Sequence, residues 1–223
     1  MKTKSTRRHE SGFTLVEMII VLAIIIAIIG IGVPSIFSQA SNQRLKDTAR
    51  DISNALTQAR GEAVRTGDIH IVYVATDAAG ALLQDNAGNN VAVLLLNDGA
   101  PGSPDQNCQI DIGEPIWTIS NVTGVGLGVV GNPAAAPHDQ GNGDETTGST
   151  FTEADGITAA TWVMFRPDGM PLSFDDTCAI GAAGSGSGGF YLQNGERSLA
   201  VVLKPMGGVR IHIYDVASSS WTE

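Results

Sequence analysis

Hydrophobic positions along the chain form one long apolar block near the N-terminus. Residues 13–33 contain a single charged residue, Glu17, among 21 positions. As an α-helix this block would extend about 30 Å at 1.5 Å per residue, which is enough to cross the hydrocarbon core of a bilayer. The pattern therefore predicts a transmembrane helix over residues 13–33.

The pattern changes after Pro34 to that of an amphipathic helix, which we expect over residues 34–67. Apolar residues recur there at alternating spacings of four and three, the arrangement that places one face of a helix on a core: Leu45, Ala49, Ile52, Leu56, Ala59 and Ala63. Gly67 is a suitable stop. The two stretches together predict one long helix, bent or loosened at Gly30, Gly32 and Pro34.

Short apolar runs separated by turn residues predict a β-rich body over residues 68–223. We expect strands at 69–75, 91–97, 116–119, 122–130, 161–165, 190–192, 198–203 and 209–214. Turns are expected at 166–169, 194–195 and 205–208. Residues 131–150 predict a long exposed loop, and the glycine-rich 181–189 a flexible connection. The fold class is α+β, with the long helix packed on an antiparallel sheet.

Charge is distributed unevenly along the chain, whose formal net charge is −10. Four of the 13 basic residues and one of the 23 acidic residues precede Gly12, so removal of residues 1–12 would leave a net charge of −13. Basic residues before an apolar span keep the N-terminus in the cytoplasm and direct the rest outward. No small-residue cleavage site of the secretory kind follows the span. We therefore expect a single-pass inner-membrane protein with a periplasmic body.

Glu17 is unusual because a carboxylate inside a membrane helix costs about 2.5–3.5 kcal/mol on insertion scales. One interpretation is an interfacial side chain that stays hydrated. Another requires cleavage after Gly12, which would create a positive amine on Phe13. Within one helix that amine and Glu17 are about 6 Å apart in rise, so the carboxylate would instead pair with the amine of a neighbouring, axially shifted helix.

The two cysteines, Cys108 and Cys178, lie 70 residues apart in polar, loop-like sequence. No Cys-x-x-Cys pair or Cys/His cluster accompanies them, which argues against zinc. In an oxidising compartment they would form a disulfide that joins two loops. Two unpaired thiols are the alternative.

The segment Gly12-Phe13-Thr14-Leu15-Val16-Glu17 resembles the class III signal of type IV pilins and pseudopilins. The resemblance implies that residues 1–12 are a leader, that a prepilin peptidase cuts between Gly12 and Phe13, and that the new Phe13 amine is methylated. It also implies that Glu17 serves assembly with other pilins. Pro34 falls where such proteins carry a helix-bending proline.

A second resemblance covers the N-terminal helix through Ala75 and then residues 161–214. Phe165-Arg166-Pro167-Asp168-Gly169 and the strands that follow are similar to minor pseudopilins of the GspH/FimT family. This resemblance implies a periplasmic body of two β-sheets packed on the helix. It also implies a place near the tip of a secretion pseudopilus or pilus. The inner-membrane assembly platform is a further expected partner.

Other chemistry has little support in the sequence. Asp139, Asn142, Asp144 and Glu145 offer oxygen ligands for calcium, but their spacing is not that of an EF-hand, and a solvated loop explains them equally well. His70 and His212 fall within strands and fit packed or exposed sheet residues better than ligands or bases. None of the common catalytic motifs occurs, so we expect no enzyme, no cofactor and no metal.

DNA uptake is the alternative function, since some related pilins carry a basic turn near the C-terminus. The corresponding stretch here is Gly207-Gly208-Val209-Arg210, with glycine at the first basic position. Lys204, Arg210 and Arg197 could form a small patch, but two or three phosphate contacts on an acidic body give only weak, salt-sensitive binding. We therefore expect a structural subunit of a secretion pseudopilus or a type IV pilus, and the signal does not separate the two.

Overall fold

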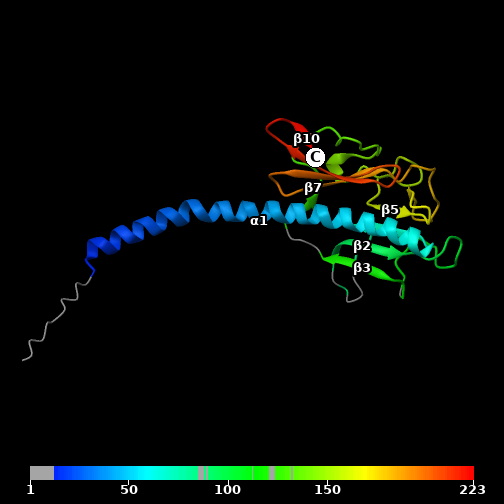
Figure 1. The fold of residues 1–223 in the computed structure, drawn as a ribbon, viewed down its shortest axis with the longest axis horizontal. Helices are drawn as coiled ribbons and strands as arrows, with labels where there is room; N and C mark the ends of the chain where they lie inside the picture. The colour runs from blue at the N-terminus through cyan, green and yellow to red at the C-terminus, as the bar shows by residue number, and fades with distance from the viewer. Residues whose placement is uncertain (1–12, 85–87, 89, 112, 121–123, 132) are drawn as a thin grey trace, which may run out of the picture. The chain divides into compact units, whose positions relative to one another are not determined.

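The computed structural model describes residues 13–84, 88, 90–111, 113–120, 124–131 and 133–223, without the side chains of residues 30–38, 119 and 120. The chain divides into two units, residues 1–40 and residues 41–223 (Figure 1). The predicted leader, including Gly12, lies outside the described residues. The architecture is α+β, as the sequence predicts, with helix packed on antiparallel sheets.

One helix, α1, runs from Leu15 to Thr66 and contributes to both units. Its helical assignment continues through Pro34. The bend predicted at Pro34 involves side chains outside the described set and stays a prediction. At the other end, Gly67 adopts a left-handed φ of 79° and its N–H donates to the Ala63 carbonyl at 3.0 Å. Glycine accepts this conformation without a steric penalty, which explains why the helix ends here.

The second half of α1 buries the predicted apolar stripe. Leu45, Ala49, Leu56, Ala59 and Ala63 are fully buried, and Ile52 is nearly so. These residues belong to one hydrophobic core that also contains side chains from both sheets. The four-three spacing therefore predicted the correct face of the helix.

The first sheet has five antiparallel strands in the order β3-β2-β1-β5-β6. At its centre, β1 pairs with β2 on one side and with β5 on the other. The strand bounds are β1 His70–Val74, β2 Val91–Asn97, β3 Ile116–Ser120, β5 Trp162–Phe165 and β6 Pro171–Leu172. Every residue of β1 is buried, as expected for a central strand covered on both faces.

The second sheet also has five antiparallel strands, in the order β10-β9-β8-β7-β4. Its middle strand β8 is buried throughout. The bounds are β4 Gly126–Leu127, β7 Gly188–Gln193, β8 Ser198–Leu203, β9 Val209–Asp215 and β10 Ser220–Thr222. Figure 1 shows the residue 41–66 part of α1 running along both sheets.

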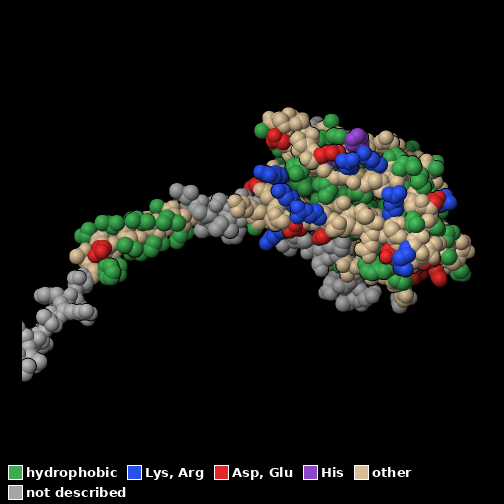
Figure 2. Space-filling view, in the orientation of Figure 1, with side chains coloured by type: hydrophobic (Ala, Val, Ile, Leu, Met, Phe, Trp, Pro, Cys, Tyr) green, Lys and Arg blue, Asp and Glu red, His purple; other side chains and the backbone are tan. Residues whose placement is uncertain are grey.

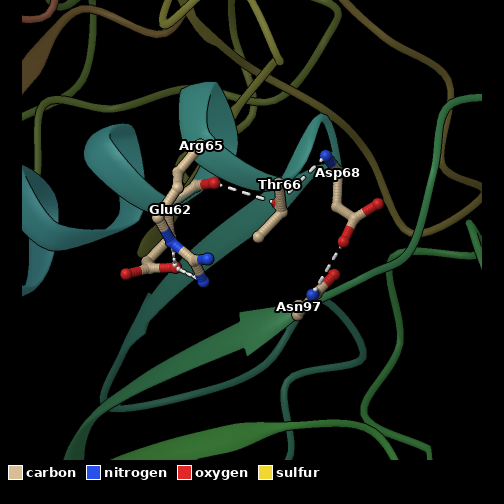
Figure 3. Close-up of polar contacts among 5 residues, drawn as sticks. All are labelled: Glu62, Arg65, Thr66, Asp68 and Asn97. Atoms are coloured by element: carbon tan, nitrogen blue, oxygen red, sulfur yellow. Dashed lines mark hydrogen bonds and ion pairs between the residues drawn. The ribbon is translucent and has the colours of Figure 1, made fainter.

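Polar contacts connect the end of α1 to the first sheet (Figure 3). Thr66 Oγ1 donates to the Glu62 carbonyl at 2.9 Å and accepts from the Asp68 N–H at 3.2 Å. Asn97, the last residue of β2, donates from Nδ2 to Asp68 Oδ2 at 3.0 Å. Arg65 Nε donates to Glu62 Oε2 at 2.8 Å on the exposed side of the last turn. These bonds fix the direction in which the chain leaves the helix and enters β1.

Residues 131–150 lie mostly outside regular secondary structure and many of them are exposed, as expected, but Pro133, Ala136 and residues 148–150 are buried. Tyr191 of β7 donates its hydroxyl to Asp139 Oδ2 at 2.6 Å and accepts the Ala136 N–H at 2.9 Å. Trp221 of β10 donates to the Ala134 carbonyl at 2.8 Å. A short 3₁₀ helix, η1 Glu145–Thr147, follows in the same segment. The segment covers part of the second sheet through contacts with distant residues, which local periodicity does not reveal.

The flexible connection expected at residues 181–189 is also partly wrong. Ser185 Oγ accepts hydrogen bonds from the backbone N–H and the hydroxyl of Ser173, at 3.1 and 2.8 Å. A Cβ atom at Gly186 would overlap the backbone of Leu172 in β6. Glycine is required there because two backbones approach closely, and β7 begins only two residues later.

The strand expected at residues 122–130 shortens to the two residues of β4. Gly124 and Gly128 adopt positive φ values of 86° and 116°, which an extended strand does not allow, and residues 121–123 lie outside the described set. Strands β6 and β10 were not predicted because each has only two or three residues. The turn expected at Arg166–Gly169 is confirmed by the 2.8 Å bond from the Gly169 N–H to the Arg166 carbonyl.

Candidate assembly site at the N-terminal helix

The first turn of α1 is capped by Thr14, a role that was not predicted for this residue. Thr14 Oγ1 accepts the Glu17 N–H at 3.2 Å, and the Thr14 carbonyl accepts the Met18 N–H at 3.2 Å. A threonine at the N-cap followed by glutamate three residues later is the capping-box sequence, a signal that was available in Thr14-Leu15-Val16-Glu17. The cap positions Glu17 in the first turn.

Glu17 is exposed and carries the only charge among the described residues 13–29. A carboxylate in the first turn of a helix interacts favourably with the partial positive charge of the helix N-terminus. That charge is spread over several N–H groups and does not replace a discrete cation. The acid therefore remains free to accept a positive group from outside its own helix.

The apolar side chains around Glu17 have no cover from the described part of this chain. Phe13 is 78% exposed and Leu15 76%, and the remaining large apolar residues through Ile29 are also exposed. Figure 2 shows this segment of α1 as an almost continuous hydrophobic surface interrupted by one acidic side chain. An apolar surface that is exposed on all sides of a helix requires either lipid or other helices around it.

No helix within the described residues contains a window long and apolar enough to count as a membrane span. The predicted span 13–33 includes residues 30–33, whose side chains lie outside the described set. Its transmembrane character stays a prediction.

The two strand histidines are buried. His70 in β1 stacks on Trp117 with ring centroids 6.2 Å apart, and His212 in β9 lies 6.4 Å from the ring of His138. Neither imidazole has a hydrogen-bond partner within the described part of the chain. Burial lowers the pKa of both side chains, so they pack as neutral rings.

Two of the acidic residues of 139–145, Asp139 and Asp144, accept hydrogen bonds from the protein itself. Asp139 Oδ2 also accepts the Thr150 hydroxyl at 2.7 Å. Asp144 caps η1 by accepting the Thr146 N–H and hydroxyl at 2.8 and 2.6 Å. These bonds lower the pKa of Asp144. Asp144 therefore caps η1, and Asp139 connects its own segment to Thr150 and to Tyr191 of β7.

The three cations considered for DNA binding do not form one patch. Lys204 and Arg210 lie near one end of the β8–β9 pair, whereas Arg197 precedes Ser198 at the opposite end, about 20 Å away at 3.3 Å per residue. Arg210 also pairs with Glu223 at 3.0 Å. These three cations therefore form no continuous track for a phosphate backbone.

Cys108 and Cys178 form a disulfide with Cα atoms 5.3 Å apart. It joins the loop after β2 to the segment after β6. Both cysteines adopt a left-handed backbone, with φ values of 58° and 61°. Non-glycine residues rarely adopt this conformation, and here the surrounding contacts maintain it at both ends of the bridge.

Comparison with known proteins concerns the N-terminal segment alone. Residues 7–33 match the model of the prokaryotic N-terminal methylation motif, which is the class III prepilin signal. Neither the curated proteins nor the solved structures contain a match to the chain. The match includes Gly12, Phe13, Thr14 and Glu17 and leaves the β-rich body outside it. This chain therefore carries the N-terminal methylation motif that serves as the prepilin signal.

Proposed function

We propose that this protein is a minor pilin or pseudopilin, a structural subunit of a periplasmic type II secretion pseudopilus or of a type IV pilus, with a place near the fibre tip. The observation that carries this proposal is the methylation motif at residues 7–33, followed by an apolar helix surface that the described chain leaves uncovered. The precursor resides in the inner membrane with its body in the periplasm. After processing, the helix enters the fibre.

Assembly follows from the chemistry of the first helical turn. Cleavage between Gly12 and Phe13 creates an amine at Phe13, which methylation leaves positively charged. In an apolar fibre core, an isolated carboxylate and an isolated amine would each be costly to bury. Pairing Glu17 with the amine of an adjacent subunit offsets much of both costs, and the pair sets the axial shift between helices. The capped turn holds the carboxylate in position for this contact.

Processing and assembly each require a partner protein. A prepilin peptidase recognises the leader, other pilins or pseudopilins contact the helix, and an inner-membrane platform drives assembly. The position near the tip and the family of minor pseudopilins rest on the resemblance of residues 161–214. The acidic body then faces partners or exported cargo.

Processing provides the direct test of this function. Mass spectrometry of the protein from its native membrane should find a chain that begins with N-methylated Phe13. Replacement of Gly12 by a bulky residue, Gly12→Val, should leave the first 12 residues attached, because Gly12 directly precedes the bond that the resemblance identifies as the cleavage site. Native protein that retains residues 1–12 would contradict the proposal.

A further inference from the structure

Asp98 is a fully buried carboxylate that the assembly site does not use. It follows β2, and its Oδ1 accepts the N–H groups of Asn107 and Cys108 at 3.3 and 3.0 Å. Its Oδ2 has no hydrogen-bond partner among the described residues. Buried carboxylate oxygens normally have partners, so an unpartnered one calls for a chemical explanation.

The surroundings of Asp98 include both sulfur atoms of the disulfide. One carboxylate oxygen of Asp98 and the Sγ atoms of Cys108 and Cys178 all lie within 4.8 Å of one another. The sulfurs are bonded to each other and offer no thiolate to a metal in this state. A base placed beside two cysteines has a different use, because thiol–disulfide exchange requires a thiolate.

The two cysteines differ in accessibility. Cys108 is only 1% exposed, and Tyr73 holds its carbonyl through a 2.7 Å hydrogen bond, whereas Cys178 is half-buried. An oxidant from solution therefore reaches Cys178 first. Cys108 must then attack as a buried thiolate, and burial in apolar surroundings opposes the loss of its proton.

We propose that Asp98 is the general base that closes the Cys108–Cys178 disulfide. A disulfide oxidant first forms a mixed disulfide on Cys178 and releases one thiol. Asp98 then takes the proton of the Cys108 thiol, the Cys108 sulfur bonds to the Cys178 sulfur, and the bond from Cys178 to the oxidant breaks, releasing a thiolate. This thiolate takes up a proton from solvent to become the second thiol, and Asp98 returns its proton to solvent. The two cysteines lose two electrons, and the oxidant's disulfide is reduced to two thiols.

The charge environment of Asp98 suits this role. The pKa of Asp98 is raised to about 7, mainly by burial and in smaller part by the nearby carboxylates Glu114 and Asp111, while the Cys108 and Asn107 N–H groups act in the opposite direction. Tyr73 is a further ionisable group in electrostatic contact with Asp98, and burial raises its pKa well above the usual 10, so it stays neutral. A base that titrates near the working pH combines a useful ionised fraction with strong proton affinity.

The test follows closure of the mixed disulfide in the full-length protein in detergent. The protein is reduced, freed of reductant and treated with glutathione disulfide, and mass spectrometry after acid quenching separates the Cys178 adduct from the closed disulfide. Asp98→Asn keeps an oxygen for the Asn107 and Cys108 N–H groups but cannot accept the proton. We expect closure to slow by roughly 100-fold, within the range typical of a positioned general base.

Asp105→Asn is the matched control, because Asp105 is an exposed carboxylate of the same loop and its change should leave the rate unchanged. Equal closure rates in the wild type and in folded Asp98→Asn would overturn the proposal. If circular dichroism shows that Asp98→Asn does not fold, the pH dependence of the closure rate in the wild type tests the proposal instead. A rate that levels off above about pH 7 supports Asp98, whereas a rate that keeps rising past about pH 8.5, the ordinary thiol value, overturns its role.

Discussion

The two halves of α1 differ in what covers their apolar side chains. From Leu45 to Ala63 the apolar residues occupy one stripe, and the chain's own sheets bury that stripe. From Phe13 to Ile29 the apolar residues surround the helix, and the described chain covers none of the large ones. The C-terminal half thus obtains its stability from its own body, whereas the N-terminal half depends on other molecules.

This difference shows that one helix can pack in two different ways along its length. A stripe with four-three spacing matches a single flat partner such as a sheet. A fully apolar cylinder matches surroundings that are apolar on every side, such as lipid or a bundle of identical helices. Glu17 is the exception in the cylinder, and it gives the N-terminal half a specific contact in addition to non-specific apolar packing.

Truncation of Leu56 should produce the largest change. Leu56 is fully buried in the stripe, and Leu56→Ala should lower the free energy of unfolding of the body by about 2–5 kcal/mol through lost contacts and a cavity. Leu22→Ala removes the same atoms from the exposed half, where Leu22 is 56% exposed, and should leave unfolding of the body unchanged. Denaturant unfolding of both variants in detergent measures the contrast. Equal losses in the two variants would remove the distinction between the halves.

A smaller effect on the free energy of unfolding is expected from the buried carboxylate of Asp98. The pKa of Asp98 rises from an ordinary 3.8 to about 7 in the folded protein, so the folded state binds this proton more tightly than the unfolded state does. Its contribution to stability is therefore fully present below about pH 4 and is lost as the pH rises towards 7. Because a tenfold change in proton affinity corresponds to about 1.4 kcal/mol, the loss is on the order of a few kcal/mol.

Asp98→Asn cannot titrate and should remove this pH dependence. The measurement is the free energy of unfolding of the wild type and of the variant at several pH values between 4 and 8, and the difference between the two curves isolates Asp98. Parallel curves across this range would show that the folded protein does not raise the proton affinity of Asp98.

The smallest effect concerns the cap of the N-terminal half. Thr14→Ala removes the acceptor for the Glu17 N–H and should destabilise the first turn by about 1 kcal/mol. Hydrogen exchange at Glu17 and Met18 should become several-fold faster, while amides of the body keep their rates. Thr14→Ser retains the hydroxyl and serves as the control. Unchanged exchange in Thr14→Ala would show that the hydroxyl does not stabilise the turn.

The sequence predicted those parts of the fold in which local pattern and burial agree. The stripe from Leu45 to Ala63 and the long apolar strands β1, β2 and β8 have strong periodicity or strong β propensity, so neighbouring residues alone identify them. The predictions failed where contacts between residues far apart in the sequence determine the structure. Segment 131–150 packs on β7 because Tyr191 and Asp139 meet across 52 residues, and no local pattern encodes that meeting.

The functional residues also differ in whether the sequence alone could identify them. Gly12, Phe13 and Glu17 were identifiable because the signal is a contiguous motif, and the family comparison recovers it at residues 7–33. Thr14 was identifiable in principle from the capping-box spacing. Asp98 was not, because its sequence context, Asn97-Asp98-Gly99, is that of an ordinary turn. Only the fold brings it beside Cys108 and Cys178.

Incorporation of a Glu17→Gln variant into the fibre tests the central claim most directly. The substitution keeps the shape of the side chain and removes its charge, so processing at Gly12 and membrane insertion should continue while the amount of protein in sheared or isolated fibres falls sharply. Met18→Leu, a neighbouring apolar change, should leave incorporation intact. Normal incorporation of Glu17→Gln would contradict pairing between this carboxylate and the amine of an adjacent subunit.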